Sequence, residues 1–192
     1  MRRFTALAAT IALFLLLGSN VAIGQVPPAP VVRHQFRVEG PPLSAPYDLV
    51  QQTLHFAPGA ATPWHTHPGQ VLVTVIEGEL TFRMRDSEKV YKTGESFAEM
   101  ANHVQQAHNT TASNTVVVVS FVLPDGAPLS AAEPGDATPL PRPAAGWQIR
   151  TDGVPLPGSY DVMQVVQDFA PGAATCGTRI PASFSSLSSR AS

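Results

Sequence analysis

Short segments of alternating or β-branched hydrophobic residues run through the middle of the chain. Each segment ends at Gly, Pro, Asp or Asn, which is typical of strands joined by tight turns. The 19 prolines and 14 glycines leave few places for a long helix. The pattern therefore predicts an all-β protein, with the clearest strands at Tyr47–Phe56, Val71–Ile76, Leu80–Met84, Val90–Lys92 and Thr115–Leu123.

Four turns are expected between these strands, at Pro58-Gly59, Glu77-Gly78, Asp86-Ser87 and Thr93-Gly94. The run of valines from Val116 to Val119 does not alternate with polar residues, which predicts a strand covered on both faces. Roughly seven short strands in about 90 residues fit either a β-sandwich or a jelly-roll barrel. Periodicity leaves both architectures open.

The N-terminus has the pattern of a secretory signal peptide. Two arginines precede an apolar stretch from Ala6 to Gly18, and small residues follow shortly before Gln25. A membrane anchor is the alternative, but Ser19 and Asn20 interrupt the stretch before it reaches the roughly 20 apolar residues that a span needs. We therefore predict a signal peptide at residues 1–24, export to the periplasm or the medium, and no membrane span in the mature chain.

Charge and cysteine content restrict the partners and the source of stability. Removal of Arg2 and Arg3 leaves 10 Lys and Arg against 14 Asp and Glu, a formal charge of −4, so no nucleic-acid partner is expected. Cys176 is the single cysteine, and an internal disulfide is therefore excluded even in an oxidising compartment. Stability must come from packing.

The C-terminal third begins with a proline-rich segment at residues 126–145, which predicts a linker. After it the chain repeats itself, because residues 40–62 and 153–175 are identical at 13 of 23 positions with a constant offset of 113. A constant offset indicates duplication, so residues 146–175 are predicted to be the first part of a second copy.

The serine-rich tail at residues 176–192 follows no strand pattern. Read two nucleotides out of frame, its codons permit Trp-His-Thr-His-Pro-Gly in the register of Trp64 to Gly69. We therefore hypothesise that a frameshift or a sequencing error truncated the second copy. The alternative is a natural serine-rich tail.

His65 and His67 are the strongest candidates for chemistry. Residues two apart on a strand face the same side, so the two imidazoles share one volume. Imidazole is a ligand for Zn, Fe, Cu, Mn and Ni. By spacing alone the pair is equally compatible with exposed polar residues near a turn.

Two stretches resemble the motifs of the cupin family. Gly59, His65-Thr66-His67 and Glu77-Gly78 resemble the first cupin motif, and Gly94 to Phe97 with the stretch ending at Asn109 resembles the second more loosely. The resemblance implies a jelly-roll barrel at about residues 34–125, and the repeat makes the parent protein resemble a bicupin.

Members of that family typically hold a divalent metal with two His and one Glu of the first motif and one His of the second. This chain departs from the pattern, because the Glu position is Val71 and the second-motif His position is Gln105. His103 has the strand parity of Gln105, and the amide oxygen of Gln70 or Gln105 is a further candidate ligand. Glu99 is a candidate replacement carboxylate, although a surface position is expected for it. The predicted metal site thus comprises His65, His67, His103 and Gln105, for Fe, Mn, Zn, Ni or Cu.

The resemblance implies a metal-dependent dioxygenase or isomerase acting on a small molecule. The alternative is a non-catalytic barrel that binds a small ligand without a metal, and the sequence leaves open whether the protein is an enzyme. A truncated second copy would also expose the edge of the strand expected at Tyr160–Phe169, which predicts a homodimer that covers it.

Overall fold

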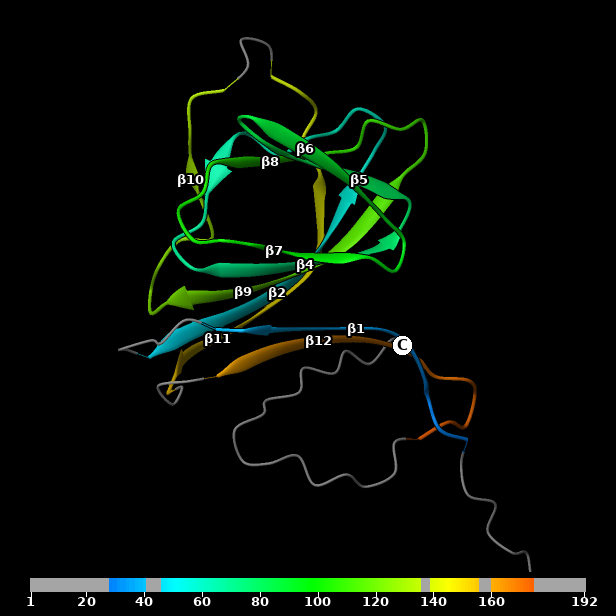
Figure 1. The fold of residues 1–192 in the computed structure, drawn as a ribbon. Helices are drawn as coiled ribbons and strands as arrows, with labels where there is room; N and C mark the ends of the chain where they lie inside the picture. Colours follow the sequence, from blue (N-terminus) through cyan, green and yellow to red (C-terminus); the bar gives the residue numbers. More distant parts are fainter. Residues whose placement is uncertain (1–27, 41–45, 136–138, 156–159, 175–192) are drawn as a thin grey trace, which may run out of the picture.

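The computed structural model describes residues 28–40, 46–135, 139–155 and 160–174, and within them it contains strands and no helix (Figure 1). The all-β prediction is confirmed. The predicted signal peptide and the tail with its hypothesised frameshift lie outside the described residues. No helix long and apolar enough to cross a membrane occurs in the described part of the chain.

Two five-stranded antiparallel sheets form a barrel, with strand orders β10-β3-β8-β5-β6 and β11-β2-β9-β4-β7 (Figure 1). Their bounds are β2 Tyr47–Phe56, β3 His65–Thr66, β4 Gln70–Glu77, β5 Glu79–Met84, β6 Ser87–Lys92, β7 Ser96–Glu99, β8 Gln105–His108, β9 Thr115–Pro124, β10 Ala131–Ala132 and β11 Ala144–Val154. Most neighbouring strands in each sheet are distant from one another in the sequence. This is the jelly-roll barrel that the resemblance implied.

Three predicted turns, at Pro58-Gly59, Glu77-Gly78 and Thr93-Gly94, lie where the sequence placed them, and the fourth lies at Arg85-Asp86, one residue earlier than predicted. Gly59, Gly78 and Gly94 adopt positive φ angles of 75°, 79° and 88°, a region that L-residues with a Cβ rarely enter. At Gly78 the backbone is also crowded, because a Cβ there would lie 2.5 Å from the carbonyl oxygen of Asn114. Glycine is therefore required at Gly78 for two separate reasons.

The barrel interior is lined by packed apolar side chains from both sheets. They include Val50, Phe56, Val73, Leu80, Phe82, Phe97, Val117, Phe121 and Leu123. Burial of each Leu or Phe contributes about 1.5–3 kcal/mol. Packing of these facing surfaces fixes the two sheets and hence the positions of the polar residues among them.

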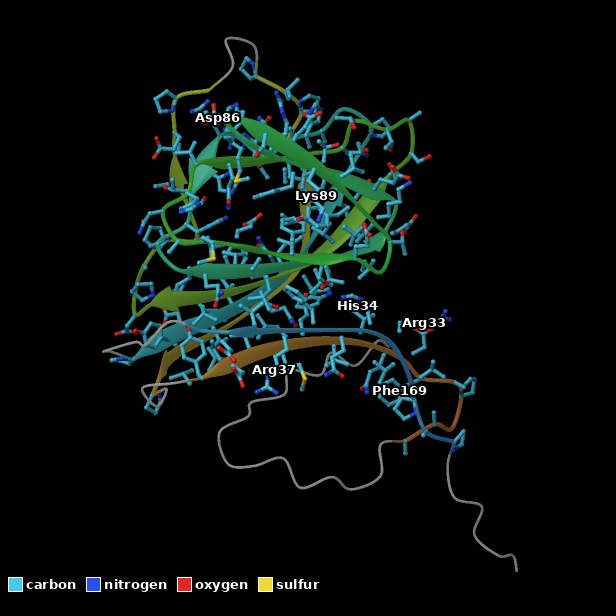
Figure 2. All side chains as sticks on the ribbon, viewed as in Figure 1. Arg33, His34, Arg37, Asp86, Lys89 and Phe169 are labelled. Carbon is cyan, nitrogen blue, oxygen red and sulfur yellow. The ribbon has the colours of Figure 1, made fainter. Side chains whose placement is uncertain are left out.

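A separate two-stranded sheet, β1 (Val31–Glu39) with β12 (Asp161–Asp168), covers the outer face of the β11-β2-β9-β4-β7 sheet (Figure 1). Gln164 of β12 is buried and donates to Ser120 Oγ at 2.9 Å. His34 of β1 faces the barrel and contacts Ser96 Oγ at 2.6 Å, whereas Arg37 lies on the opposite side of β1 (Figure 2). The valine-rich β9 is thus covered on both faces, as its sequence predicted.

The pairing of β1 with β12 has the same register as the pairing of β11 with β2. Val38 lies opposite Val162, and Thr151 lies opposite Leu49. Thr151 is the repeat equivalent of Val38, and Val162 is the repeat equivalent of Leu49, each 113 residues later in the sequence. Gln51 Nε2 and Gln164 Nε2, which are related by the same offset, both donate to Ser120 Oγ. The first strand of each repeated segment therefore pairs with the second strand of the other.

The ion pairs between β1 and β12 and between β11 and β2 are also related by the repeat. Arg37 pairs with Asp161, and Arg150 pairs with Asp48. The repeat offset relates the two arginines to each other and likewise the two aspartates. The Asp48 carboxylate also accepts hydrogen bonds from the N–H groups of Gly126 and Gly153, at 2.8 and 3.1 Å.

The segment predicted as a linker contacts the barrel along its described length. We call residues 127–135 and 139–143 the strap. Its strand β10 pairs with β3, Glu133 N–H donates to the Trp64 carbonyl at 2.9 Å, and Ala61 N–H donates to the Pro141 carbonyl at 2.8 Å. The strap therefore lies beside the segment that carries His65 and His67.

Candidate metal centre

His65 and His67 come from the short strand β3 and its end, and both side chains face the barrel interior. They are buried, with the two Nε2 atoms 3.0 Å apart. The ring of His67 also contacts the ring of Phe121 edge to face, with centroids 5.4 Å apart. Period-two alternation on the strand thus brings the imidazoles together as predicted from the sequence.

A backbone carbonyl fixes the tautomer of each imidazole. The Nδ1 of His65 lies 2.7 Å from the Pro63 carbonyl, and the Nδ1 of His67 lies 2.6 Å from the Leu129 carbonyl. Carbonyl oxygens only accept hydrogen bonds, so each Nδ1 carries a proton, and in the neutral form of the ring the lone pair is on Nε2. Hydrogen bonds of this kind orient histidines that bind a metal through the other ring nitrogen.

Glu99, at the end of β7, brings a carboxylate to the same place. Its Oε2 lies 3.1 Å from His67 Nε2, and the ligand atoms of His65, His67 and Glu99 all lie within 4.8 Å of one another. The expectation of a surface position for Glu99 is wrong, because the residue is only 5% exposed. The strand pairing that buries it is long-range and is not visible in the local sequence.

These three groups fit a divalent cation. Two lone pairs and a carboxylate directed at one volume repel one another unless a cation or a proton lies between them. Two of the separations between the ligand atoms are 3.0 and 3.1 Å, and all three atoms lie within 4.8 Å of one another. The donor set, two imidazoles and one carboxylate, is one that divalent transition metals accept.

The protonation state of His65 favours ligation. Burial lowers the pKa of the His65 imidazole, and the nearby His67 lowers it further, while the Pro63 hydrogen bond and Glu99 oppose the change. The net shift of the pKa is downward, so the ring is neutral near pH 7. A neutral imidazole is the form that binds a metal.

The structure places the other predicted ligands in three different environments. Gln105 is buried on β8 directly opposite His65, and its Nε2 has no hydrogen-bond partner among the described residues. His103 is exposed in the turn after β7 and is not in the three-residue cluster. Gln70 is buried but shares its strand face with Thr74, which contacts β12 outside the barrel.

Gln105 faces His65 across the pairing of β8 with β3. It shares a strand face with Ala107, which lines the interior cavity. A flip of the amide group would direct its oxygen where the unpartnered nitrogen now lies, and the two orientations have the same shape. The role of Gln105 as an oxygen ligand, from the strand facing His65, stays a prediction.

The three candidate ligands open onto a cavity of about 370 Å³ inside the barrel. Its walls are mainly apolar, from Leu54, Phe56, Val73, Leu80, Val117, Val119, Phe121 and Leu129. Polar groups are Gln52, Thr62, Ser130, Arg142 and the three ligands. A site of this kind, with a few polar groups in an apolar enclosure, suits a small organic molecule.

The comparison with protein families agrees with this architecture. Residues 52–122 match the family described as "Cupin domain". A double-stranded β-helix protein from Klebsiella pneumoniae subsp. pneumoniae MGH 78578 is 27% identical, with 53% of this chain and 86% of that chain covered and a TM-score of 0.41. A cupin superfamily protein from Desulfitobacterium hafniense DCB-2 is 11% identical, with 47% and 78% covered and a TM-score of 0.38. No curated protein matches the chain.

Proposed function

Because residues 52–122 form a cupin domain, we propose that this protein binds one divalent metal ion through His65, His67 and Glu99 and uses it on a small molecule in the barrel. The observation that carries the proposal is the convergence of the three buried ligand atoms. Two histidines and one carboxylate with open positions form the donor set of non-haem Fe(II) oxygenases. We therefore propose a metal-dependent oxygenase, with Fe(II) as the first metal to test.

The residues of the chain divide the work in this proposal. His65, His67 and Glu99 hold the ion, and the Pro63 and Leu129 carbonyls orient the two imidazoles. When bound, the metal supplies Lewis-acid and oxygen chemistry. The apolar wall excludes water and holds the substrate body, which is the usual role of such a surface in a small-molecule site.

Metal content tests the proposal. Protein beginning at Gln25 is purified without chelators, and metal per chain is measured for wild type, His65→Ala, His67→Ala and Glu99→Gln. About one metal per chain that is lost in all three variants supports the site. His103→Ala serves as the control and is expected to keep the metal, because His103 is exposed and outside the cluster.

Wild-type protein is also reconstituted with Fe(II), Mn(II), Zn(II), Ni(II) and Cu(II) in turn. Failure to bind any of these metals would refute the metal site. The alternative is then a non-catalytic barrel that binds a small ligand, an interpretation that the mainly apolar cavity favours. Substrate-dependent oxygen uptake by the Fe(II) form, absent in Glu99→Gln, would support the oxygenase. A metal-loaded protein that binds small molecules without turnover would support the binding function.

Export is part of the same proposal and rests on residues 1–24 of the sequence. Expression of the full chain in a bacterial host, followed by fractionation and N-terminal mass spectrometry, tests it. A periplasmic or secreted product that begins at Gln25 is expected. A cytoplasmic product that retains Met1 would contradict export.

We also propose that residues 146–175 derive from a second copy of the barrel unit and that the chain forms a homodimer. The matched registers of β1–β12 and β11–β2 support the duplication. Among the described residues β12 pairs on one edge only, and its outward Met163 and Val165 are each more than one third exposed. Light scattering tests the dimer, and Val165→Glu is expected to yield monomer if this strand forms the contact.

A further inference from the structure

We propose that the barrel cavity takes a small carboxylate with an apolar body, and that Arg142 of the strap binds the carboxylate group. This inference rests on the proposed function and names its substrate class. Arg142 lies outside the matched cupin domain at residues 52–122. The specificity of the site would then come from a segment added to the barrel.

The strap holds Arg142 at the cavity. The preceding residue, Pro141, accepts a hydrogen bond from Ala61 N–H at 2.8 Å, which fixes the strap against the chain just before His65. Arg142 lines the metal cavity together with Thr62 and Pro63, and it also lines a neighbouring cavity of about 230 Å³. Arg142 therefore stands where the two cavities meet.

Arg142 differs from the other arginines that the structure describes. Arg33, Arg37, Arg83, Arg85 and Arg150 each form an ion pair or a hydrogen bond through the guanidinium. Within the same described residues the guanidinium of Arg142 has no such partner, and it is the only Lys or Arg side chain lining the metal cavity. A cation at a cavity without an internal anion of its own is available to an anionic ligand.

The chemistry of the walls selects the class of anion. A guanidinium binds a carboxylate through two parallel N–H···O bonds. Leu54, Leu80 and Val119 offer an apolar surface for a hydrocarbon body. Inorganic phosphate is polar on every side and would leave this surface uncovered, so the cavity favours a carboxylate with an apolar chain.

The experiment uses hexanoate as the probe and hexanamide as its neutral counterpart. Binding to the metal-loaded full mature chain is measured by calorimetry for wild type, Arg142→Gln and Arg142→Lys. Arg33→Gln is the matched control, because Arg33 lies exposed on β1 beneath the barrel (Figure 2). Metal content is measured on every sample.

We expect hexanoate to bind wild type and the Arg33→Gln control equally, and to bind Arg142→Gln roughly ten- to hundredfold more weakly. Arg142→Lys should retain an intermediate affinity, and hexanamide should bind weakly to all forms. The inference is overturned if wild type and Arg142→Gln both contain metal and bind hexanoate equally. It is also overturned if metal-loaded wild type does not bind hexanoate. Preference for phosphate over hexanoate overturns the carboxylate class, whereas absence of metal in wild type refutes the proposed function instead.

Discussion

Val71 and Glu99 lie directly opposite one another on the neighbouring antiparallel strands β4 and β7. Side chains at opposed positions of such a pair share one face of the sheet. Val71 occupies the position where the first cupin motif has its Glu, and Glu99 brings a carboxylate to the same volume from the adjacent strand. The structure thus offers a carboxylate one strand away from the position where the resemblance locates it.

This relationship predicts that the carboxylate can be moved back. Glu99→Val should lose the metal, and the double variant Val71→Glu/Glu99→Val should regain it, because the two side chains face one volume. Metal per chain after reconstitution provides the measurement.

The control for that exchange is Glu95→Val combined with Val71→Glu, which leaves Glu99 in place and removes a carboxylate from the turn before β7. It should bind metal at least as well as wild type. A folded double variant at positions 71 and 99 that stays free of metal would show that the two positions are not interchangeable.

Gln105→His should strengthen metal binding. Gln105 is buried opposite His65, so an imidazole there can add a fourth protein ligand. We expect an affinity gain of about tenfold or more in a competition with a chelator. Unchanged affinity in a folded variant would place position 105 beyond the reach of the ion.

Two turn glycines should differ in their tolerance of alanine. A Cβ added at Gly94 would meet open space, so Gly94→Ala should cost only the strain of a positive φ, about 1 kcal/mol. Gly78→Ala adds a contact of 2.5 Å with the Asn114 carbonyl and should cost about 2 kcal/mol or more. Urea unfolding compares the two variants, and equal costs would contradict the crowding at Gly78.

Asp48 should make stability depend on acid. Burial tends to raise its pKa, but hydrogen bonds from Gly126 and Gly153 and the pairing with Arg150 lower it below the usual 3.8. A depressed folded-state pKa contributes stability above the ordinary value, and this contribution is lost as the pH falls through the folded-state pKa. Asp48→Asn should therefore have a Tm several degrees below that of wild type near pH 7. Below about pH 4 the difference in Tm between the two proteins should become smaller.

Thermal unfolding between pH 7 and pH 2 measures this dependence. Asp86→Asn is the matched control, since Asp86 is exposed at the far end of the barrel from β1 (Figure 2). It should follow wild type throughout. A constant difference between Asp48→Asn and wild type over the whole range would contradict the assigned pKa direction.

Local sequence was sufficient for the barrel strands β2, β4, β5, β6 and β9, but it did not identify β3, β7, β8, β10 or β11. The β2 strand has the predicted bounds of Tyr47–Phe56, and Gly59 and Gly78 mark turns that only residues with free φ adopt readily. The sequence also sufficed to predict that His65 and His67 face the same side, because residues two apart on a strand always do so. The resemblance to cupins then selected the jelly roll over the sandwich, which periodicity had left open.

Tertiary structure alone decided which groups join the two histidines. Glu99 reaches them through the pairing of β7 with β4, and Leu129 and Arg142 reach the cavity because the strap pairs with β3. The repeat was visible in the sequence, whereas the exchange of β1 and β11 between its two segments was not. These relationships join residues far apart along the chain, and their registers depend on the packing of whole sheets, which no local pattern encodes.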